Sequence, residues 1–202
     1  MLVRHGESTA NRDHLVPGRL LDAELTDLGI QQAHLAAERV CGLARGKVRV
    51  VSSDAQRAHQ TAAMIASRLG GTIDSTELLR EQYLGDLEGR PVCELTAEPV
   101  PAGFDISEVN WGGGESIAQV HRRMRRLLDE LAGWPHLPQT VVLVGHGHAF
   151  AVLLAVLAGR GHRDVDWVGD ALPLGGVRAV EWQAGTAPPP RVKPAAADPQ
   201  IW

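Results

Sequence analysis

The chain alternates short runs of β-branched and apolar residues with longer stretches of helical periodicity. The short runs are residues 2–3, 48–51, 140–144 and 177–182. The first three are almost continuously apolar, as strands covered on both faces of a sheet are. Alternating strands and helices are typical of the α/β fold class. The sequence therefore predicts a three-layer α/β/α sandwich with a mostly parallel central sheet.

Four stretches carry the helical period, at residues 26–44, 54–69, 116–132 and about 149–157. In the second, Asp54 is placed to cap the N-terminus and Gly70 to end the helix. In the third, an apolar stripe faces the core, the arginine cluster at 122–126 faces solvent, and Gly133 ends the helix. The fourth is apolar on every side, which predicts a helix buried by its neighbours.

Polar residues follow three of the predicted strands, where α/β sheets bind their ligands. Arg4 and His5 follow the first strand, His146 follows the 140–144 strand, and Arg57 comes soon after the 48–51 strand. A single histidine beside a glycine often does no more than end a strand. If the three strands are neighbours, however, two imidazoles and two guanidinium groups converge. Such a pocket suits a phosphate or a carboxylate.

The same strand ends carry a resemblance to a known family. Residues 2–11, LVRHGESTAN, are similar to the defining motif of the histidine phosphatase superfamily, which has the phosphoglycerate mutase-like fold. Further blocks follow in the family's order: DAELT at 22–26, SSDAQRAHQTA at 52–62, LREQYLGDLEG at 79–89, GGES at 113–116 and VGHG at 144–147. RHG alone carries little weight, but ordered blocks at the family's spacing favour membership.

The resemblance implies a phosphatase that forms a phosphohistidine on His5 and needs neither a metal nor another cofactor. A neutral imidazole is a competent nucleophile when its tautomer is fixed and the phosphoryl charge is screened. The positions that match the family's phosphate pocket are Arg4, Arg57 and His146, whose positive charge would stabilise the transition state. The substrate would be a small phosphorylated molecule.

Three further residues complete the implied site. Asn11 matches the asparagine of the first motif and would donate to the phosphate, and Gly147 belongs to the same substrate-binding set. Glu81 matches the family's general acid, which would protonate the leaving alkoxide and then activate water. Spacing alone does not distinguish Glu81 from other nearby carboxylates, namely Asp86, Glu88 and Glu115.

His148 departs from the family pattern, which more often has a small residue after His-Gly. His146 and His148 could both reach one face of an extended segment. A zinc site would need a third ligand, and the sequence identifies none. The remaining histidines are expected to be exposed to solvent; they are His14, His34, His59, His121, His136 and His162.

The segment at residues 84–115, called here the excursion, helps to distinguish a phosphatase from a mutase. Residues 91–111 contain no Arg or Lys, whereas mutases of this fold usually have an arginine pair there. The sequence therefore favours a phosphatase for a small-metabolite monophosphate whose alcohol is apolar or neutral. Phosphoglycerate mutase-type transfer and a non-catalytic protein that binds phosphorylated ligands remain the alternatives.

Length and charge restrict the other possibilities. We expect one domain over residues 1–184, with the excursion over the active site, followed by a Pro/Ala-rich tail at 185–202. The net charge of −4 does not fit a partner that is a nucleic acid or an anionic membrane. Two cysteines without a CxxC motif, and the lack of a signal-like N-terminus, favour reduced thiols and a cytoplasmic location. The oligomeric state stays open.

Overall fold

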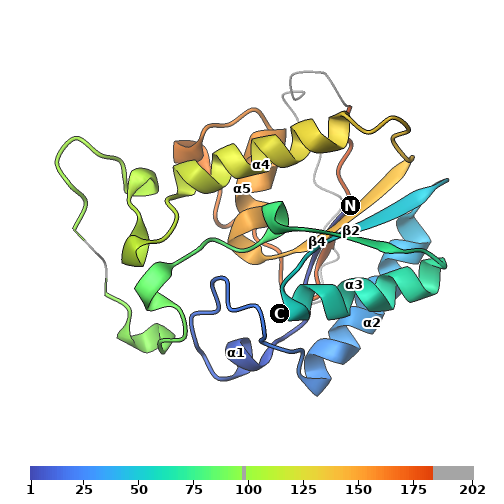
Figure 1. Cartoon of the computed structure of the whole chain (residues 1–202), viewed down its shortest axis with the longest axis horizontal. Coiled ribbons are helices and arrows are strands. Elements are labelled where there is room, and N and C mark those ends of the chain that lie inside the picture. The colour runs from blue at the N-terminus through green and yellow to red at the C-terminus, as the bar shows by residue number, and fades with distance from the viewer. Residues whose placement is uncertain (97–98, 184–202) are drawn as a thin grey trace.

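The computed structural model describes residues 1–96 and 99–183 and is built around a twisted sheet (Figure 1). The strand order is β3-β2-β4-β1-β5. Strands β1 to β4 run parallel, and β5 pairs antiparallel with β1. The bounds are Leu2–Arg4 (β1), Val48–Ser53 (β2), Ile73–Thr76 (β3), Thr140–Gly145 (β4) and Val177–Arg178 (β5). The predicted α/β class with a mostly parallel sheet is confirmed.

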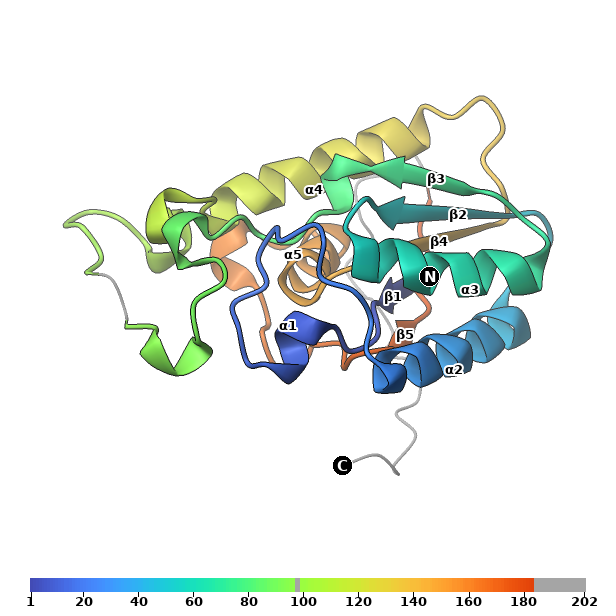
Figure 2. The ribbon, with the colours of Figure 1, turned by 60° about the horizontal axis from the view of Figure 1, so that its bottom comes forward.

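Helices cover both faces of the sheet (Figure 2). One face packs α2 (Asp27–Leu43) and α3 (Gln56–Leu69) against Val3 and Val142. The other packs α4 (Ile117–Ala132) and α5 (Gly147–Leu157) against Leu2 and Leu143. Successive strand residues point to opposite faces, so each strand contributes to both layers. Every residue of α5 from Ala149 onward is buried, as its uniformly apolar sequence predicts.

Short helices fill the connections. A four-residue helix, α1 (Thr9–Arg12), follows β1. The excursion contains only single 3₁₀ turns among its described residues. The turns within the excursion are η2 (Gly85–Leu87), η3 (Val92–Glu94), η4 (Ile106–Glu108) and η5 (Trp111–Gly113), whereas η1 (Glu77–Leu79) precedes it and η6 (His162–Asp164) follows α5. The tail predicted at 185–202 lies outside the described residues.

Several local predictions were wrong. Asp54 does not cap α3, which begins at Gln56; its carboxylate instead accepts from Arg80 Nε at 2.8 Å. Within the arginine cluster of α4, Arg123 does not face solvent, because it donates to the Leu78 carbonyl at 2.6 Å and pairs with Glu115 at 3.0 Å. Two histidines expected to be exposed, His121 and His162, are half-buried.

The strand order brings the three predicted strand ends together. β4 lies between β1 and β2, with Arg4 beside Gly145 and Ser52 beside Val144 in the register. The loop after β1 then packs directly on α2: a Cβ at Gly6 would lie 2.2 Å from the carbonyl oxygen of Gly29. Only glycine allows this approach of two backbones. The condition set by the sequence, that the strands are neighbours, is therefore met.

Candidate active site

His5 lies at the carboxyl end of β1 and is only 2% exposed. Its Nδ1 lies 2.6 Å from the Gly6 carbonyl oxygen. A carbonyl can only accept a hydrogen bond, so Nδ1 carries the ring proton. The other nitrogen, Nε2, accepts from Arg57 Nε at 3.3 Å. His5 therefore presents the lone pair of Nε2 beside a guanidinium group.

Both site histidines are neutral near pH 7. Burial first, and then the charge of Arg57, holds the pKa of His5 well below its ordinary value. Burial and Arg57 likewise hold the pKa of His146 well below its ordinary value. The sequence assigned a positive charge to His146, and here the structure differs. The positive charge of the site comes from its arginines, and His146 contributes an uncharged imidazole.

Arg57 is completely buried at the start of α3. Besides its contact with His5, it donates from Nη2 to the Gly18 carbonyl at 3.0 Å and from Nη1 to the Leu20 carbonyl at 2.5 Å. Burial lowers the pKa of Arg57, yet a guanidinium group stays protonated in proteins. The three bonds fix the orientation of the positive charge beside His5 Nε2.

Two buried nitrogens of this site have no hydrogen-bond partner. They are Arg4 Nε and His146 Nδ1, and no other buried side-chain nitrogen or oxygen of the described residues lacks a partner. Arg4 donates from Nη1 to the Leu172 carbonyl at 2.8 Å, and His146 Nε2 lies 2.9 Å from Ser53 Oγ. Unpartnered buried polar atoms are uncommon in folded proteins. These two unpartnered nitrogens lie at the ends of adjacent strands and next to a buried arginine. This arrangement points to an anionic ligand with several oxygen atoms.

Glu81 caps the N-terminus of α5. Its carboxylate accepts the backbone N–H groups of His148 at 3.1 Å and Ala149 at 2.9 Å, and also that of Gln82 at 3.0 Å. Burial raises the pKa of Glu81, but nearby His148 and these three N–H donors outweigh burial, so the net pKa lies below the ordinary value. Glu81 is therefore ionised at neutral pH.

Four of the predicted residues share one cavity of about 620 Å³, called here the Arg4 cavity. They are Arg4, Asn11, Glu81 and Gly147. The structure brings His5, Arg57 and His146 next to this group, but they are buried and do not line the cavity. The side-chain oxygen of Asn11 is used locally, because it accepts from Ser8 Oγ at 2.8 Å. Only the amide nitrogen of Asn11 is left for a ligand.

The competing carboxylates have other contacts. Glu88 accepts the backbone N–H groups of Arg19 at 2.8 Å and Leu84 at 3.0 Å. Glu115 pairs with Arg19 at 2.8 Å and with Arg123 at 3.0 Å. Asp86 is exposed. None of these three lines the Arg4 cavity, so the geometry favours Glu81 among the four.

Several supporting residues could not be found from the sequence. Ser53 stands within the family block at residues 52–62, but nothing marked it as the partner of His146. Gly18, Leu20 and Leu172 act through backbone carbonyls, which carry no signal of residue type. His148 and His146 do not converge: His148 Nδ1 lies 3.2 Å from Gln82 Oε1. Within residues 1–96 and 99–183, no three His, Cys, Asp or Glu side chains gather as a metal site requires.

Gly147 allows Arg4 to lie against the start of α5. A Cβ at this position would lie 3.1 Å from Arg4 Cζ. We therefore expect Gly147→Ala to displace the guanidinium group and to lower kcat/KM for a phosphorylated substrate by about tenfold. The matched control is Gly42→Ala on α2, where a Cβ meets nothing within 4 Å. Equal kcat/KM for the two variants would contradict this account of Gly147.

The fold and the site together define an α/β protein whose parallel strands end at a buried, arginine-lined histidine. Residues 1–188 match the histidine phosphatase superfamily (branch 1), and the chain belongs to this family. Over 162 residues it is 38% identical to the probable phosphoglycerate mutase GpmB of Yersinia pestis, a match that covers 78% of this chain and 74% of the relative. No described helix is long and apolar enough to cross a membrane.

Solved structures give similar matches. A mycobacterial glucosyl-3-phosphoglycerate phosphatase, in complex with VO3, superposes with a TM-score of 0.72 at 32% identity, over 86% of this chain and 88% of that one. A putative alpha-ribazole-5'-P phosphatase from Escherichia coli superposes with a TM-score of 0.72 at 27% identity, over 86% and 85% of the two chains. The named relatives are thus a phosphatase, a putative phosphatase and a probable mutase.

Proposed function

We propose that the protein is a metal-independent phosphatase that hydrolyses a small-metabolite phosphomonoester through a phosphohistidine on His5. One observation carries the proposal. The unpartnered nitrogens of Arg4 and His146 lie beside a neutral His5 whose Nε2 is free of a proton. A phosphoryl group placed there would receive hydrogen bonds from both nitrogens and face an imidazole lone pair. The solved phosphatases of the same fold support the reaction class.

Ser53 can set the tautomer that would make His146 a donor. Ser53 Oγ accepts the backbone N–H of Ala55 at 3.3 Å, and its own proton is free to bond His146 Nε2. The ring proton of His146 then lies on Nδ1, where it can donate to a phosphoryl oxygen. His146 would bind the phosphoryl group as a neutral donor, while Arg4 and Arg57 supply charge.

The proposed reaction has two displacements. In the first, His5 Nε2 bonds to phosphorus, the ester oxygen departs, and protonated Glu81 gives that oxygen its proton. In the second, Glu81 takes a proton from water, the water oxygen bonds to phosphorus, and the bond to His5 breaks. Orthophosphate leaves, and both side chains return to their first state. Fixed arginine donors stabilise the charge that spreads over the phosphoryl oxygens.

The charges around the cavity favour hydrolysis over phosphoglycerate mutase chemistry. A mutase must hold a second anionic group of its substrate. Near the site, Arg19 pairs with Glu115 at 2.8 Å and Arg163 pairs with Glu108 at 2.8 Å. The excursion adds no arginine or lysine at residues 91–111. The similarity to a probable phosphoglycerate mutase keeps mutase activity as the second candidate.

The test measures phosphate release from a panel of phosphomonoesters with EDTA present. We expect turnover without added metal, and a phosphorylated form of the protein that is labile in acid and stable in base. Conversion of 3-phosphoglycerate to its 2-isomer, in the absence of phosphate release, would favour the mutase. Ligand protection without turnover or a phosphorylated form would favour a binding protein.

The pH dependence tests Glu81. Because the pKa of Glu81 lies below its ordinary value, the acid form of Glu81 is scarce at neutral pH and becomes more populated as the pH falls. The lowered pKa of His5 keeps the imidazole neutral over the same pH range. We therefore expect kcat/KM for an alkyl phosphate to rise from pH 8 towards pH 5. Glu81→Gln should lose about a hundredfold at the acid end. In Glu81→Gln, only the titration of the substrate phosphate should determine how kcat/KM varies with pH.

The control for this experiment is Glu130→Gln, an exposed position on α4. It should keep the wild-type profile. A Glu81→Gln profile as steep as that of the wild type would mean that another group protonates the leaving oxygen. With 4-nitrophenyl phosphate, whose leaving group needs little protonation, the loss in Glu81→Gln should be much smaller.

A further inference from the structure

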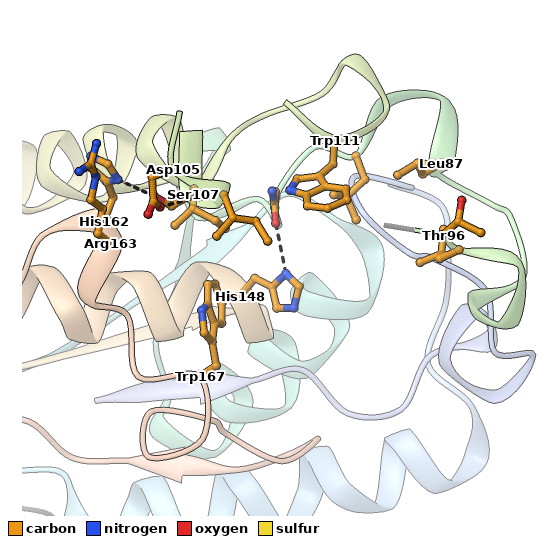
Figure 3. A pocket seen from close by; sticks show the side chains of 14 residues that line it. Leu87, Thr96, Asp105, Ser107, Trp111, His148, His162, Arg163 and Trp167 are labelled. Atoms are coloured by element: carbon orange, nitrogen blue, oxygen red, sulfur yellow. Dashed lines mark hydrogen bonds between the residues drawn. The ribbon is translucent and has the colours of Figure 1, made fainter. Parts of the chain in front are cut away.

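A second cavity, of about 520 Å³, adjoins the Arg4 cavity (Figure 3). We call it the Trp111 cavity. The two share three wall residues: Leu84, His148 and Trp167. Figure 3 shows the indole of Trp111 across from His148, with Trp167 on the other side of the histidine. The shared wall makes the Trp111 cavity a continuation of the space beside Glu81.

His148 connects the two cavities chemically. Its backbone N–H donates to Glu81 at 3.1 Å, and its ring packs edge-on against Trp167 with 5.3 Å between ring centroids. The ring also contacts Gln82 at 3.2 Å. Glu81, the carboxylate proposed to protonate the leaving oxygen, is thus hydrogen-bonded to a residue that lines both cavities. A leaving alcohol beside Glu81 would extend past His148 into that cavity.

The Trp111 cavity is mainly apolar. Besides the shared leucine and tryptophan, its wall includes Leu87, Ile106, Trp111 and Ile117. Ile106 is 58% exposed and Trp167 is 45% exposed. Large apolar side chains exposed around a concave site mark a ligand-binding surface, because a ligand that covers them removes apolar area from water and lowers the free energy.

The charged groups of this cavity have partners within the protein. The carboxylate of Asp105 accepts the backbone N–H of Ser107 at 2.9 Å, and Ser107 Oγ lies 2.8 Å from His162 Nδ1. Arg163 pairs with Glu108 at 2.8 Å. The one described arginine of the wall, Arg163, is thus already paired with a carboxylate, and Asp105 on the same wall would repel a second anion. The wall therefore suits a neutral group.

We propose that the Trp111 cavity binds the alcohol portion of the substrate and selects an uncharged, mainly hydrocarbon or aromatic alcohol. This inference rests on the proposed phosphatase function and specifies its substrate class. Burial of each additional methylene should raise kcat/KM about threefold to fourfold until the cavity is filled. The gain arises because apolar surface of the alcohol leaves water while the phosphate end stays with Arg4 and Arg57.

The experiment compares kcat/KM for ethyl, butyl, hexyl and octyl phosphate, with 1-naphthyl phosphate and 3-phosphoglycerate alongside. The wild type should prefer the hexyl, octyl and 1-naphthyl esters over ethyl phosphate by at least about thirtyfold. Trp111→Ala and Trp167→Ala should each reduce the octyl-to-ethyl ratio by about tenfold. Phe104→Ala is the matched control: this aromatic is exposed on the excursion and does not line the cavity, so its ratio should equal that of the wild type.

Failure of this inference differs from failure of the proposed function. Equal kcat/KM across the alkyl series, or a preference for 3-phosphoglycerate, would overturn the inference while the phosphatase stands. If no ester is hydrolysed, calorimetric titration with 1-naphthol decides. Binding that is lost in Trp111→Ala and Trp167→Ala would support the cavity as the alcohol site, and absence of binding would overturn it.

Discussion

Replacement of His5 by alanine is expected to reduce phosphate release at least about a thousandfold and to abolish the phosphorylated form of the protein. His5 is a neutral imidazole whose Nε2 accepts a hydrogen bond from the Arg57 guanidinium group at 3.3 Å. Without it, water would have to attack phosphorus directly, and the remaining site could only bind and polarise the ester. Loss of a covalent nucleophile usually costs at least this much.

The measurement combines steady-state turnover with rapid acid-free quenching to recover the phosphohistidine. His59→Ala provides the control, since this exposed histidine lies on α3 away from the site. Binding of inorganic phosphate to His5→Ala should persist, because the unpartnered nitrogens of Arg4 and His146 remain. Turnover that stays within tenfold of the wild type would show that His5 is not the nucleophile.

Arg57→Lys is expected to lower kcat/KM by several hundredfold and to lower the free energy of unfolding by about 2 kcal/mol. An ammonium group keeps the charge but cannot reproduce three planar donations. The carbonyls of Gly18 and Leu20 would lose their donor, and His5 Nε2 would lose its oriented neighbour. Arg57→Lys therefore tests whether kcat/KM depends on the positive charge alone or also on the direction of the hydrogen bonds.

Arg68→Lys supplies the comparison on the same helix, at an exposed arginine that pairs with Glu38 at 3.0 Å. It should leave both turnover and denaturant unfolding within error of the wild type, as surface ion pairs contribute little. If Arg57→Lys keeps wild-type kcat/KM, positive charge alone would suffice at this position, and the bonds to Gly18 and Leu20 would have only a structural role.

Much of the fold could be predicted because its core elements have strong periodic patterns. The three buried strands and four long helices fall close to their predicted positions. β3 (Ile73–Thr76) was missed because its sequence, IDST, is short, polar and partly exposed at the sheet edge. β5 is only two residues long, although the apolar run extends to Trp182. β5 is an edge strand that pairs only with the three-residue β1, so few residues of the run can form ladder hydrogen bonds.

The candidate site was predicted mostly through the resemblance, and physical reasoning explains what was left out. Residue spacing could bring Arg4, His5, Arg57 and His146 to one edge, because parallel strands share that edge. It could not show that burial leaves His146 uncharged, since this depends on the finished core. Residue spacing also could not show which of Glu81, Glu88 and Glu115 faces the cavity. Their positions depend on contacts with backbone N–H groups and with an arginine distant in the sequence.

The position of α5 has a consequence for how such a protein could acquire new substrates. His146, Gly147 and the N–H groups that hold Glu81 all belong to the start of one helix that is embedded in the core. Most residues around the proposed alcohol site come instead from the excursion and from the loop that carries Trp167, and His148 is the wall residue that belongs to α5. The residues proposed for the reaction and most of those proposed for selectivity therefore lie on different segments, which meet at His148. Insertions or substitutions in the outer segments can reshape the accepted alcohol while the phosphoryl-transfer geometry stays anchored.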